Sequence, residues 1–275
     1  MFHQTKVTAA AQASGLAVSG VSVSAGKTPI VKDLSFHAAT GEMLAIIGPS
    51  GSGKTTLMKA MTGEMSYCGQ ITLAGLEVGD LAPEFMADMR AVLPQASQIS
   101  FPLTASEVVG LGLIDRRRNR QERARRVAEA LARVGLSGFE GRIYQDLSGG
   151  EQQRVQLARV LCQVWDPVPA GGPPRWLFLD EPVSSLDIKH QYQIMRLAAD
   201  YAARGGGVVA VMHDLNLTAA FADRALVMRD GTRLAFGARD EVMQPELLSR
   251  AYGFPLEILE RRGSARPVIV PVEAD

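Results

Sequence analysis

The chain has 275 residues, 47% of them hydrophobic, and its 29 basic and 29 acidic residues leave no net charge at neutral pH. This length allows one large domain or two small ones with a sizeable buried core. The charge balance argues against a nucleic-acid-binding surface or a polybasic membrane anchor. The longest apolar runs, such as residues 208–212, have the length of a strand and not the roughly 18 residues of a membrane-spanning helix.

The first residues predict little regular structure. Residues 1–15 lack the apolar core of a secretion signal, so we expect a flexible polar tail. The two cysteines, Cys68 and Cys162, are far apart and have no metal-binding pattern around them. We expect both to be reduced thiols, one of them in the core.

Strands are expected next. Residues 16–23 and 30–38 alternate apolar and polar side chains on either side of a turn at Gly26, which predicts an antiparallel pair. The pair leads into an apolar run at residues 43–47, and residues 69–75 predict another short strand.

A glycine-rich segment directly follows the apolar run: Gly48, Pro49, Ser50, Gly51, Ser52, Gly53, Lys54, Thr55 and Thr56. Glycines let successive backbone N–H groups close around anionic oxygens, and the helix expected next offers its positive end. Lys54 would reach the outer phosphates of a nucleotide, and the Thr55 hydroxyl would bind Mg²⁺. The alternative is a glycine-rich turn that matches by accident, which the flanking strand and helix disfavour. The segment predicts a nucleotide site.

Residues 101–150 have a helical pattern. Helix starts are expected at Thr104 and Asn119, because each is followed three residues later by a glutamate, and Gly135 is a suitable stop. The basic residues between 116 and 126 are interrupted by acidic ones, so we interpret them as an exposed helix start and not as a polyanion site. An inserted helical subdomain is expected at about residues 101–152.

Two continuous apolar runs follow a Gly/Pro-rich stretch, residues 166–174, that we expect to be a surface loop. The runs, residues 175–180 and 207–212, predict buried strands of a parallel sheet, and residues 188–204 between them predict a helix.

The last part of the chain predicts short strands. A hairpin is expected where residues 225–228 and 232–236 flank the Asp230-Gly231 turn. Residues 267–271 suggest one further strand.

Polar residues stand at the ends of the two buried strands. Asp180 would hold the Mg²⁺ shell, and Glu181 would orient the attacking water or accept its proton. The alternative for this acidic pair is capping of a helix that starts near Pro182. His213 would contact the γ-phosphate, although a lone histidine there is more often a satisfied core residue. His190 has no comparable context and is expected on the surface.

Further segments follow in the order used by one ATPase family, and the chain resembles the nucleotide-binding subunit of ABC transporters. Residues 147–154, Leu-Ser-Gly-Gly-Glu-Gln-Gln-Arg, match the signature motif of that family. The other matches are residues 176–181 for the second acidic motif, 184–187 for the loop between subunits, Gln95 for the glutamine loop and His213 for the switch histidine. The resemblance extends over residues 16–253.

The resemblance implies a fold and a set of cofactors. The fold would be an α/β P-loop NTPase (RecA-like) core with an N-terminal antiparallel β subdomain and an inserted α-helical subdomain. This nucleotide-binding domain would span residues 16–254, followed by a C-terminal extension at 255–275. ATP and Mg²⁺ are the implied cofactors, with Thr55, Gln95 and Asp180 around the ion. The implied catalytic residues are Glu181, His213 and Gln95.

The signature segment combines a serine, glycines and a helix N-terminus into an anion site that has no phosphate nearby in its own subunit. The resemblance implies a head-to-tail homodimer, in which this segment closes over the ATP held by Lys54 of the other subunit. The residues that would contact ATP across the interface are Ser148, Gly149, Gly150, Glu151 and Asp187. Closure on ATP and opening after hydrolysis would drive transport.

Some segments resemble one branch of the family. Residues 91–95, 99–104 and 107–112 look like bacterial importers of haem, iron-siderophores and vitamin B12, and residues 173–180 and 213–218 look most like ATPases of haemin importers. The resemblance implies a peripheral subunit on the cytoplasmic face of the bacterial inner membrane. Its partners would be two copies of a separate transmembrane permease and, indirectly, a periplasmic haem-binding protein. An iron-siderophore or vitamin B12 importer is the alternative, because the cargo rests on likeness alone.

A soluble chromosome-maintenance or repair ATPase would share the phosphate loop and the signature. Those proteins place hundreds of coiled-coil residues between the two motifs, whereas only residues 57–146 separate them here, without sustained heptads. We therefore expect no nucleic-acid partner. One position departs from the ABC pattern: where the family commonly has an aromatic residue that stacks on adenine, this chain has Ala25.

Overall fold

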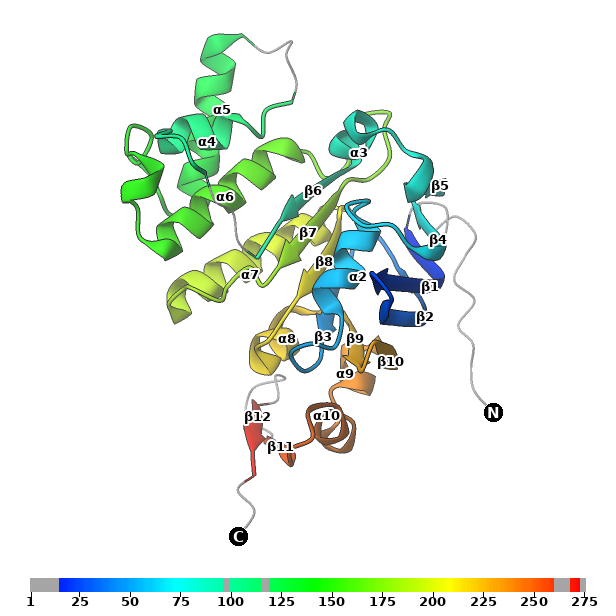
Figure 1. The fold of residues 1–275 in the computed structure, drawn as a ribbon. Coiled ribbons are helices and arrows are strands. Elements are labelled where there is room, and N and C mark those ends of the chain that lie inside the picture. The colour runs from blue at the N-terminus through cyan, green and yellow to red at the C-terminus, as the bar shows by residue number, and fades with distance from the viewer. Residues whose placement is uncertain (1–14, 96–98, 115–118, 260–267, 273–275) are drawn as a thin grey trace.

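The computed structural model describes residues 15–95, 99–114, 119–259 and 268–272. A mixed six-stranded sheet forms the centre of the molecule, with a smaller antiparallel sheet on one side and a group of helices at the far edge (Figure 1). No helix in these residue ranges is both long and apolar enough to cross a bilayer. The predicted tail at residues 1–15 lies almost entirely outside the described residues.

The central sheet has the order β10-β9-β3-β8-β7-β6. Strands β9, β3, β8, β7 and β6 run parallel to one another, and only β10, at the edge beside β9, runs antiparallel. Their bounds are β3 Met43–Ile47, β6 Arg90–Leu93, β7 Trp176–Asp180, β8 Gly207–Val211, β9 Arg224–Arg229 and β10 Thr232–Ala238. The predicted parallel strands and the β9–β10 hairpin are confirmed.

Both faces of this sheet are covered, which explains the continuous apolar runs in its strands. In β3, Leu44 and Ile46 pack in one hydrophobic cluster, while Met43, Ala45 and Ile47 pack in a second cluster on the other face. Helix α2 (Lys54–Met61) covers the first face. The second is covered mainly by α6 (Gly149–Gln163), α7 (Ile188–Ala203) and α8 (Leu215–Phe221).

The antiparallel sheet packs on the same side as α2. Its order is β2-β1-β4-β5, and its bounds are β1 Leu16–Ala25, β2 Thr28–Ala38, β4 Cys68–Leu73 and β5 Leu76–Glu77. The predicted β1–β2 pair is confirmed, and Gly26 has the positive φ of +61° that its turn requires. A 3-10 turn (Val78–Asp80) and α3 (Pro83–Met89), which was not predicted, connect this sheet to β6.

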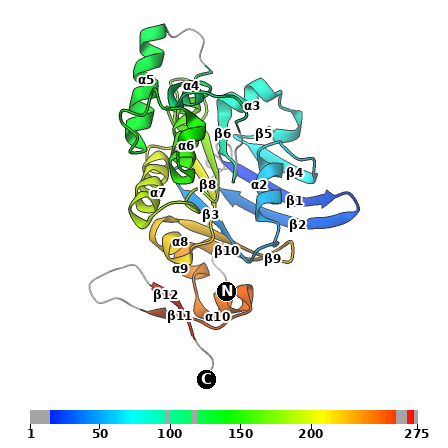
Figure 2. The ribbon, with the colours of Figure 1, turned by 60° about the vertical axis from the view of Figure 1, so that its left-hand side comes forward.

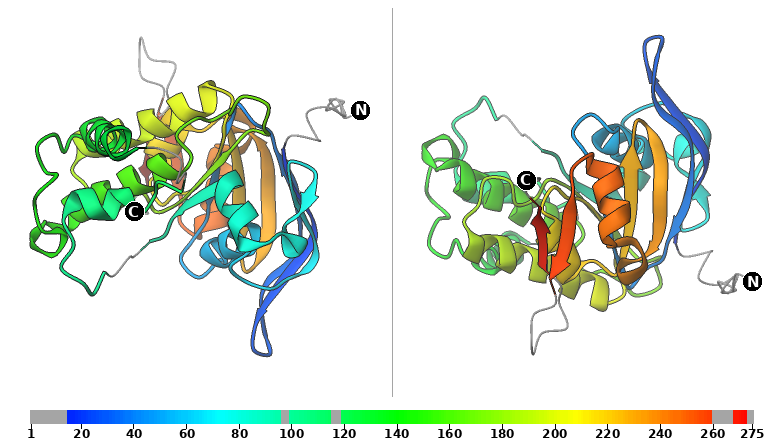
Figure 3. Two further views of the ribbon diagram at one scale, coloured as in Figure 1. Left: turned by 90° about the horizontal axis from the view of Figure 1, so that it is seen from above. Right: turned by 90° about the horizontal axis from the view of Figure 1, so that it is seen from below.

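Helices α4 (Ala105–Gly110) and α5 (Arg120–Arg133) lie beside α6 beyond the edge of the central sheet (Figure 3). Thr104 and Asn119 cap their N-termini as predicted, each in a reciprocal capping box. Gly135 follows α5 with a φ of +74°. Helix α6 starts inside the expected helical region and continues beyond residue 152. Three residues of the basic run, 116–118, lie outside the described residues.

The C-terminal part adds α9 (Arg239–Val242), α10 (Pro245–Tyr252) and an antiparallel pair, β11 (Leu256–Leu259) and β12 (Val268–Pro271) (Figure 2). Strand β12 confirms the extra strand expected at residues 267–271, while its partner β11 was not predicted. Cys162 is buried and Cys68 is exposed, and neither forms a disulfide, as expected.

Candidate functional site

The predicted polar residues follow the carboxyl ends of four neighbouring parallel strands of the central sheet, β3, β8, β7 and β6. The phosphate loop follows β3, Asp180 ends β7, and His213 follows β8. Gln95 follows the edge strand β6 and is exposed.

The backbone of the phosphate loop requires glycine at several positions. Gly48, Gly51 and Gly53 have φ angles of +144°, +78° and +96°. A Cβ atom on Gly48 would lie 2.1 Å from the carbonyl oxygen of Met228, so no side chain fits there. The loop is therefore held in one shape by its own sequence and by β9.

Lys54 folds back over this loop. Its Nζ donates to the carbonyl oxygens of Gly48 at 2.8 Å and Pro49 at 2.9 Å. Burial lowers the pKa of Lys54, and the nearby carboxylates of Glu181 and Asp180 oppose that shift. Among the described residues, the hydroxyl of Ser52 is buried and has no hydrogen-bond partner. An unpartnered hydroxyl and a buried ammonium in a loop of this shape fit an anionic ligand.

Two side chains with oxygen atoms that can bind a metal ion come together beside the loop. Thr55 Oγ1 donates to Asp180 Oδ1 at 3.2 Å, and Asp180 is only 5% exposed. Burial raises the pKa of Asp180, while the hydrogen bond from Thr55 lowers it. A hydroxyl and a carboxylate next to a phosphate site are the ligands that Mg²⁺ prefers, so these residues fit the expected ion. No hydrogen bond joins Gln95 to either of them within the described part of the chain; Gln95 lines a small cavity with Gly149 and Ser185.

The structure brings Glu181 and His213 together. His213 Nε2 lies 2.6 Å from Glu181 Oε1. Glu181 has a φ of +51°, which is uncommon for a residue with a side chain, and its N–H donates to the carbonyl of Val211 on β8. The backbone thereby turns the carboxylate toward the histidine at the end of the neighbouring strand. An acidic side chain fixed in this way can orient a water molecule or accept its proton.

The signature residues form the N-terminus of α6. Ser148 is its N-cap, and its Oγ donates to Glu151 Oε2 at 2.7 Å. The hydrogen bonds from Ser148 lower the pKa of Glu151. Ser148 and Gly149 are exposed, whereas Gly150 lies close to the loop between β7 and α7, since a Cβ on it would be 3.1 Å from Ser185 O.

Asp187 caps the next helix on this surface, α7. Its Oδ1 accepts a hydrogen bond from the His190 N–H at 2.9 Å, and the His190 ring lies 2.8 Å from the same carboxylate. These bonds lower the pKa of Asp187. His190, expected as a surface residue, is half-buried by this contact.

The signature helix is separated from the phosphate loop of its own chain. Helix α6 packs along β6, on the face of the sheet opposite to α2. Adjacent strands lie ~4.8 Å apart, so β3 and β6, three places apart in the sheet, are about 14 Å from each other. Within one subunit, the exposed residues Ser148 and Gly149 therefore lie beside β6 and not beside the phosphate loop after β3.

Two residues at the site were missed by sequence reasoning. Gly48 donates its N–H to the hydroxyl of Tyr252 at 3.1 Å, and Gln153 Nε2 donates to the carbonyl of Glu181 at 3.1 Å. Gln153 lies within the signature segment, so its helical position offered a weak signal. Tyr252 lies 204 residues from Gly48 and carried none.

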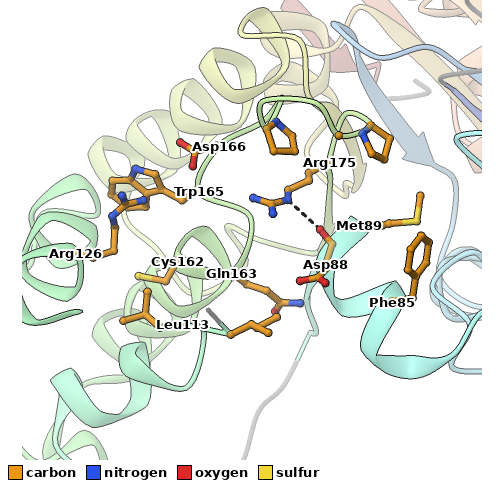
Figure 4. Close-up of a pocket in the computed structure, with 14 residues that line it drawn as sticks. Phe85, Asp88, Met89, Leu113, Arg126, Cys162, Gln163, Trp165, Asp166 and Arg175 are labelled. Atoms are coloured by element: carbon orange, nitrogen blue, oxygen red, sulfur yellow. Dashed lines mark hydrogen bonds between the residues drawn. The ribbon is translucent and has the colours of Figure 1, made fainter. Parts of the chain in front are cut away.

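A larger pocket of about 630 Å³ lies away from these residues, between α3, the middle of α5 and the C-terminal end of α6 (Figure 4). Phe85 and Leu113 line it together with the charged side chains of Arg126 and Arg175. Phe85 is 47% exposed. The pocket therefore combines apolar walls with charged edges.

Taken together, the glycine loop after β3, the Thr55–Asp180 pair and the Glu181–His213 pair on a parallel sheet define a P-loop nucleoside triphosphatase. Residues 31–184 match the ABC transporter family. The chain belongs to that family, and it is an ATP-binding cassette.

Relatives extend the match to most of the chain. A protein of Jannaschia sp. (strain CCS1) named hemin import ATP-binding protein HmuV is 56% identical over 245 residues, covering 88% of this chain and 89% of its own. The protein of the same name from Rhizobium johnstonii is 52% identical and covers 92% of this chain and 96% of its own.

Solved structures agree with the fold. A metal-chelate type ABC transporter in an inward-facing conformation has a TM-score of 0.76 at 22% identity and covers 94% of this chain and 98% of its own. A dimeric ATP-binding cassette in a post-hydrolysis state, bound to ADP and phosphate, has a TM-score of 0.72 at 28% identity and covers 82% of this chain and 98% of its own. The expected α/β P-loop fold with its β subdomain is confirmed.

Proposed function

We propose that this chain is the ATP-hydrolysing subunit of a bacterial importer that moves haem across the inner membrane. The observation that carries the proposal is the similarity, over about nine tenths of the chain, to proteins named for hemin import. The Thr55–Asp180 and Glu181–His213 contacts support the proposal, because ATP hydrolysis needs a site for Mg²⁺ and a side chain that handles the attacking water.

The residues divide the work of hydrolysis. The phosphate loop and Lys54 bind the outer phosphates, and the incoming phosphate oxygens replace the carbonyls to which Nζ now donates. Thr55 and Asp180 would hold Mg²⁺, which would neutralise phosphate charge, and Gln95, just after β6, would be a further ligand of the ion. Glu181 orients the attacking water, and His213 fixes the Glu181 carboxylate and contacts the γ-phosphate.

The working unit is a head-to-tail homodimer. The support is the exposed N-terminus of α6 with Ser148 and Gly149, which suits an anion and belongs to a helix that packs along β6, three places from β3 in the sheet. A related cassette, 28% identical, is dimeric with ADP and phosphate bound. In the twofold dimer, Ser148, Gly150 and Asp187 of one subunit face the ATP of the other.

The pocket in Figure 4 is the site where the permease docks. Its mixed lining of Phe85, Leu113, Arg126 and Arg175 suits a short amphipathic segment of a membrane protein, and it lies between the helical part and the core. Each of two permease copies would insert one cytoplasmic segment into one cassette. The cassette would thereby lie on the cytoplasmic face of the inner membrane.

The test is to co-express the chain with a haem permease from the same organism and to purify the complex in detergent. We expect the two to co-purify and ATP hydrolysis to rise when haem-loaded periplasmic binding protein is added. Stimulation only by siderophore-loaded or cobalamin-loaded binding proteins would instead assign one of those cargoes. Loss of the permease during purification, together with DNA-stimulated hydrolysis, would contradict transport altogether.

A further inference from the structure

The last α-helix of the chain reaches the first glycine of the phosphate loop. Tyr252 ends α10, and its hydroxyl accepts the hydrogen bond from the Gly48 N–H at 3.1 Å. Burial raises the pKa of Tyr252 to about 12, so the hydroxyl is neutral at physiological pH. Gly253 follows with a φ of +69°, and its N–H closes the helix on the carbonyl of Ser249 at 2.8 Å.

Gly48 is thus held from two sides. Its N–H is bound by Tyr252, and its carbonyl oxygen is bound by Lys54 Nζ at 2.8 Å. A Cβ on Gly48 would lie 2.1 Å from Met228 O, so only glycine fits between the loop and β9. A change at the tyrosine hydroxyl is therefore transmitted through one residue to the loop that carries Lys54.

Helix α10 is itself anchored to the sheet. Leu248 and Ala251 are buried, and Arg229 of β9 donates to the carbonyl oxygen of Arg250. At its C-terminal end, Ser249 Oγ accepts from the Leu256 N–H at 2.8 Å, which ties α10 to β11.

The β11–β12 pair is in turn tied to the helix that follows His213. Asn216 of α8 accepts from the Ile269 N–H at 2.8 Å and donates to the Ile269 carbonyl at 3.2 Å, in the manner of a neighbouring strand. The β11–β12 pair is therefore attached to both α10 and α8, with Ile269 buried in the hydrophobic core.

We propose that Tyr252 is a positioning residue for the nucleotide site, which sets the orientation of Gly48 and thereby the phosphate loop for tight binding of the triphosphate. The inference rests on the proposed binding of ATP by this loop. Tyr252 contacts the loop and neither the nucleotide base nor the attacking water. Its loss therefore weakens the binding of ATP, ADP and GTP alike and leaves the rate of the hydrolytic step nearly unchanged.

The test compares Tyr252→Phe with Tyr201→Phe. Tyr201 on α7 is more deeply buried than Tyr252, with 1% of its surface exposed, and within the described residues its hydroxyl has no hydrogen-bond partner, so Tyr201→Phe removes a hydroxyl without removing a hydrogen bond and serves as the control. We expect Tyr252→Phe to raise the Kd for ATP and for ADP about 3- to 10-fold, the range for one lost neutral hydrogen bond, with kcat at saturating ATP within about twofold. Tyr201→Phe should bind as the wild type does.

Thermal unfolding of both variants without nucleotide separates positioning from packing. If Tyr252→Phe lowered the Tm but left both Kd values unchanged, Tyr252 would be a packing residue and the inference would be wrong. A weakening confined to ATP, with ADP unaffected, would also overturn it. If the wild type itself bound no ATP, the proposed function would be wrong as well. If the wild type bound ATP normally and the Tyr252→Phe variant had the same Kd values, only this inference would be wrong.

Discussion

Glu181 occupies a backbone conformation that few residues with side chains adopt, and the neighbouring strand maintains it. Its φ is +51°, its N–H is bound by Val211, and its carbonyl accepts from Gln153. Such a conformation persists only where its surroundings enforce it. Here the result is a carboxylate that faces His213, which is the arrangement expected of a residue that handles the attacking water.

We predict that Glu181→Gln keeps ATP affinity near the wild-type value and lowers kcat by about 10²- to 10⁴-fold, because an amide of the same shape cannot accept the proton. Single-turnover hydrolysis and nucleotide titration measure the two quantities. Glu129→Gln, at an exposed glutamate of α5, serves as the control. Near-normal hydrolysis by the Glu181 variant would remove Glu181 from the mechanism.

Ala25 gives a second prediction for a single residue. It lies exposed at the end of β1, beside the turn, so it offers no ring on which adenine can stack. We expect little discrimination between ATP and GTP, and in Ala25→Tyr a gain in ATP affinity of at most about tenfold, since an aromatic stack adds ~0.5–1.5 kcal/mol. Titration of both nucleotides into both proteins checks this; a strong ATP preference in the wild type, unchanged by tyrosine, would mean that another residue binds the base.

The residues of the site differ in how far the sequence predicts them. Lys54, Asp180 and His213 each stand next to a local strand pattern, so their convergence follows from parallel strands ending at one edge. Tyr252 could not be predicted, because its contact with Gly48 depends on how α10 packs on β9. Tertiary packing, which no short window of sequence encodes, brings it to the loop.

At the scale of elements, two signals predicted most of the fold. Apolar runs predicted β3, β7 and β8, because both faces of the central sheet are covered, and glutamate-containing capping boxes predicted α4 and α5. The helices that were missed, such as α3, α9 and α10, have eight residues or fewer. The N-cap is alanine in α3 and α9 and glutamine in α10. Neither residue is among the serine, threonine, aspartate and asparagine caps that mark a helix start in a sequence.

The N-cap of α5 can be tested directly. Asn119 Oδ1 accepts a hydrogen bond from the Glu122 N–H at 2.9 Å. We therefore predict that Asn119→Ala lowers the free energy of unfolding by about 1 kcal/mol. For a domain of this size the Tm falls by about 2–4 °C per kcal/mol, measured by thermal unfolding. Asn119→Asp keeps the acceptor and should unfold near the wild-type temperature. An unchanged Tm in the alanine variant would mean that the cap contributes nothing to stability.

At the scale of the whole molecule, the central sheet separates the phosphate loop from the N-terminus of α6. Helix α2 covers one face, α6 packs along β6 on the other, and the N-terminus of α6 is exposed. In the proposed dimer, this N-terminus would enclose the ATP of the second copy.

We therefore predict that Ser148→Arg leaves ATP binding by the monomer within about twofold of the wild type but prevents ATP-dependent dimerisation, because the added guanidinium fills the space meant for the phosphates of the partner. Sedimentation in the Glu181→Gln background, where ATP persists, measures the dimer. Ser19→Arg, at an exposed serine of β1, is the control. A Ser148→Arg variant that still dimerised on ATP would contradict the trans site.

Haem uptake by proteoliposomes tests the account most directly. The complex of this chain with its permease is reconstituted with the cassette side inside, ATP is enclosed, and haem-loaded binding protein is added outside. The account predicts uptake of haem that requires enclosed ATP and is abolished by Glu181→Gln. Haem uptake that persists without ATP or in the Glu181→Gln complex, or ATP-driven uptake of cobalamin or a siderophore in place of haem, would contradict it.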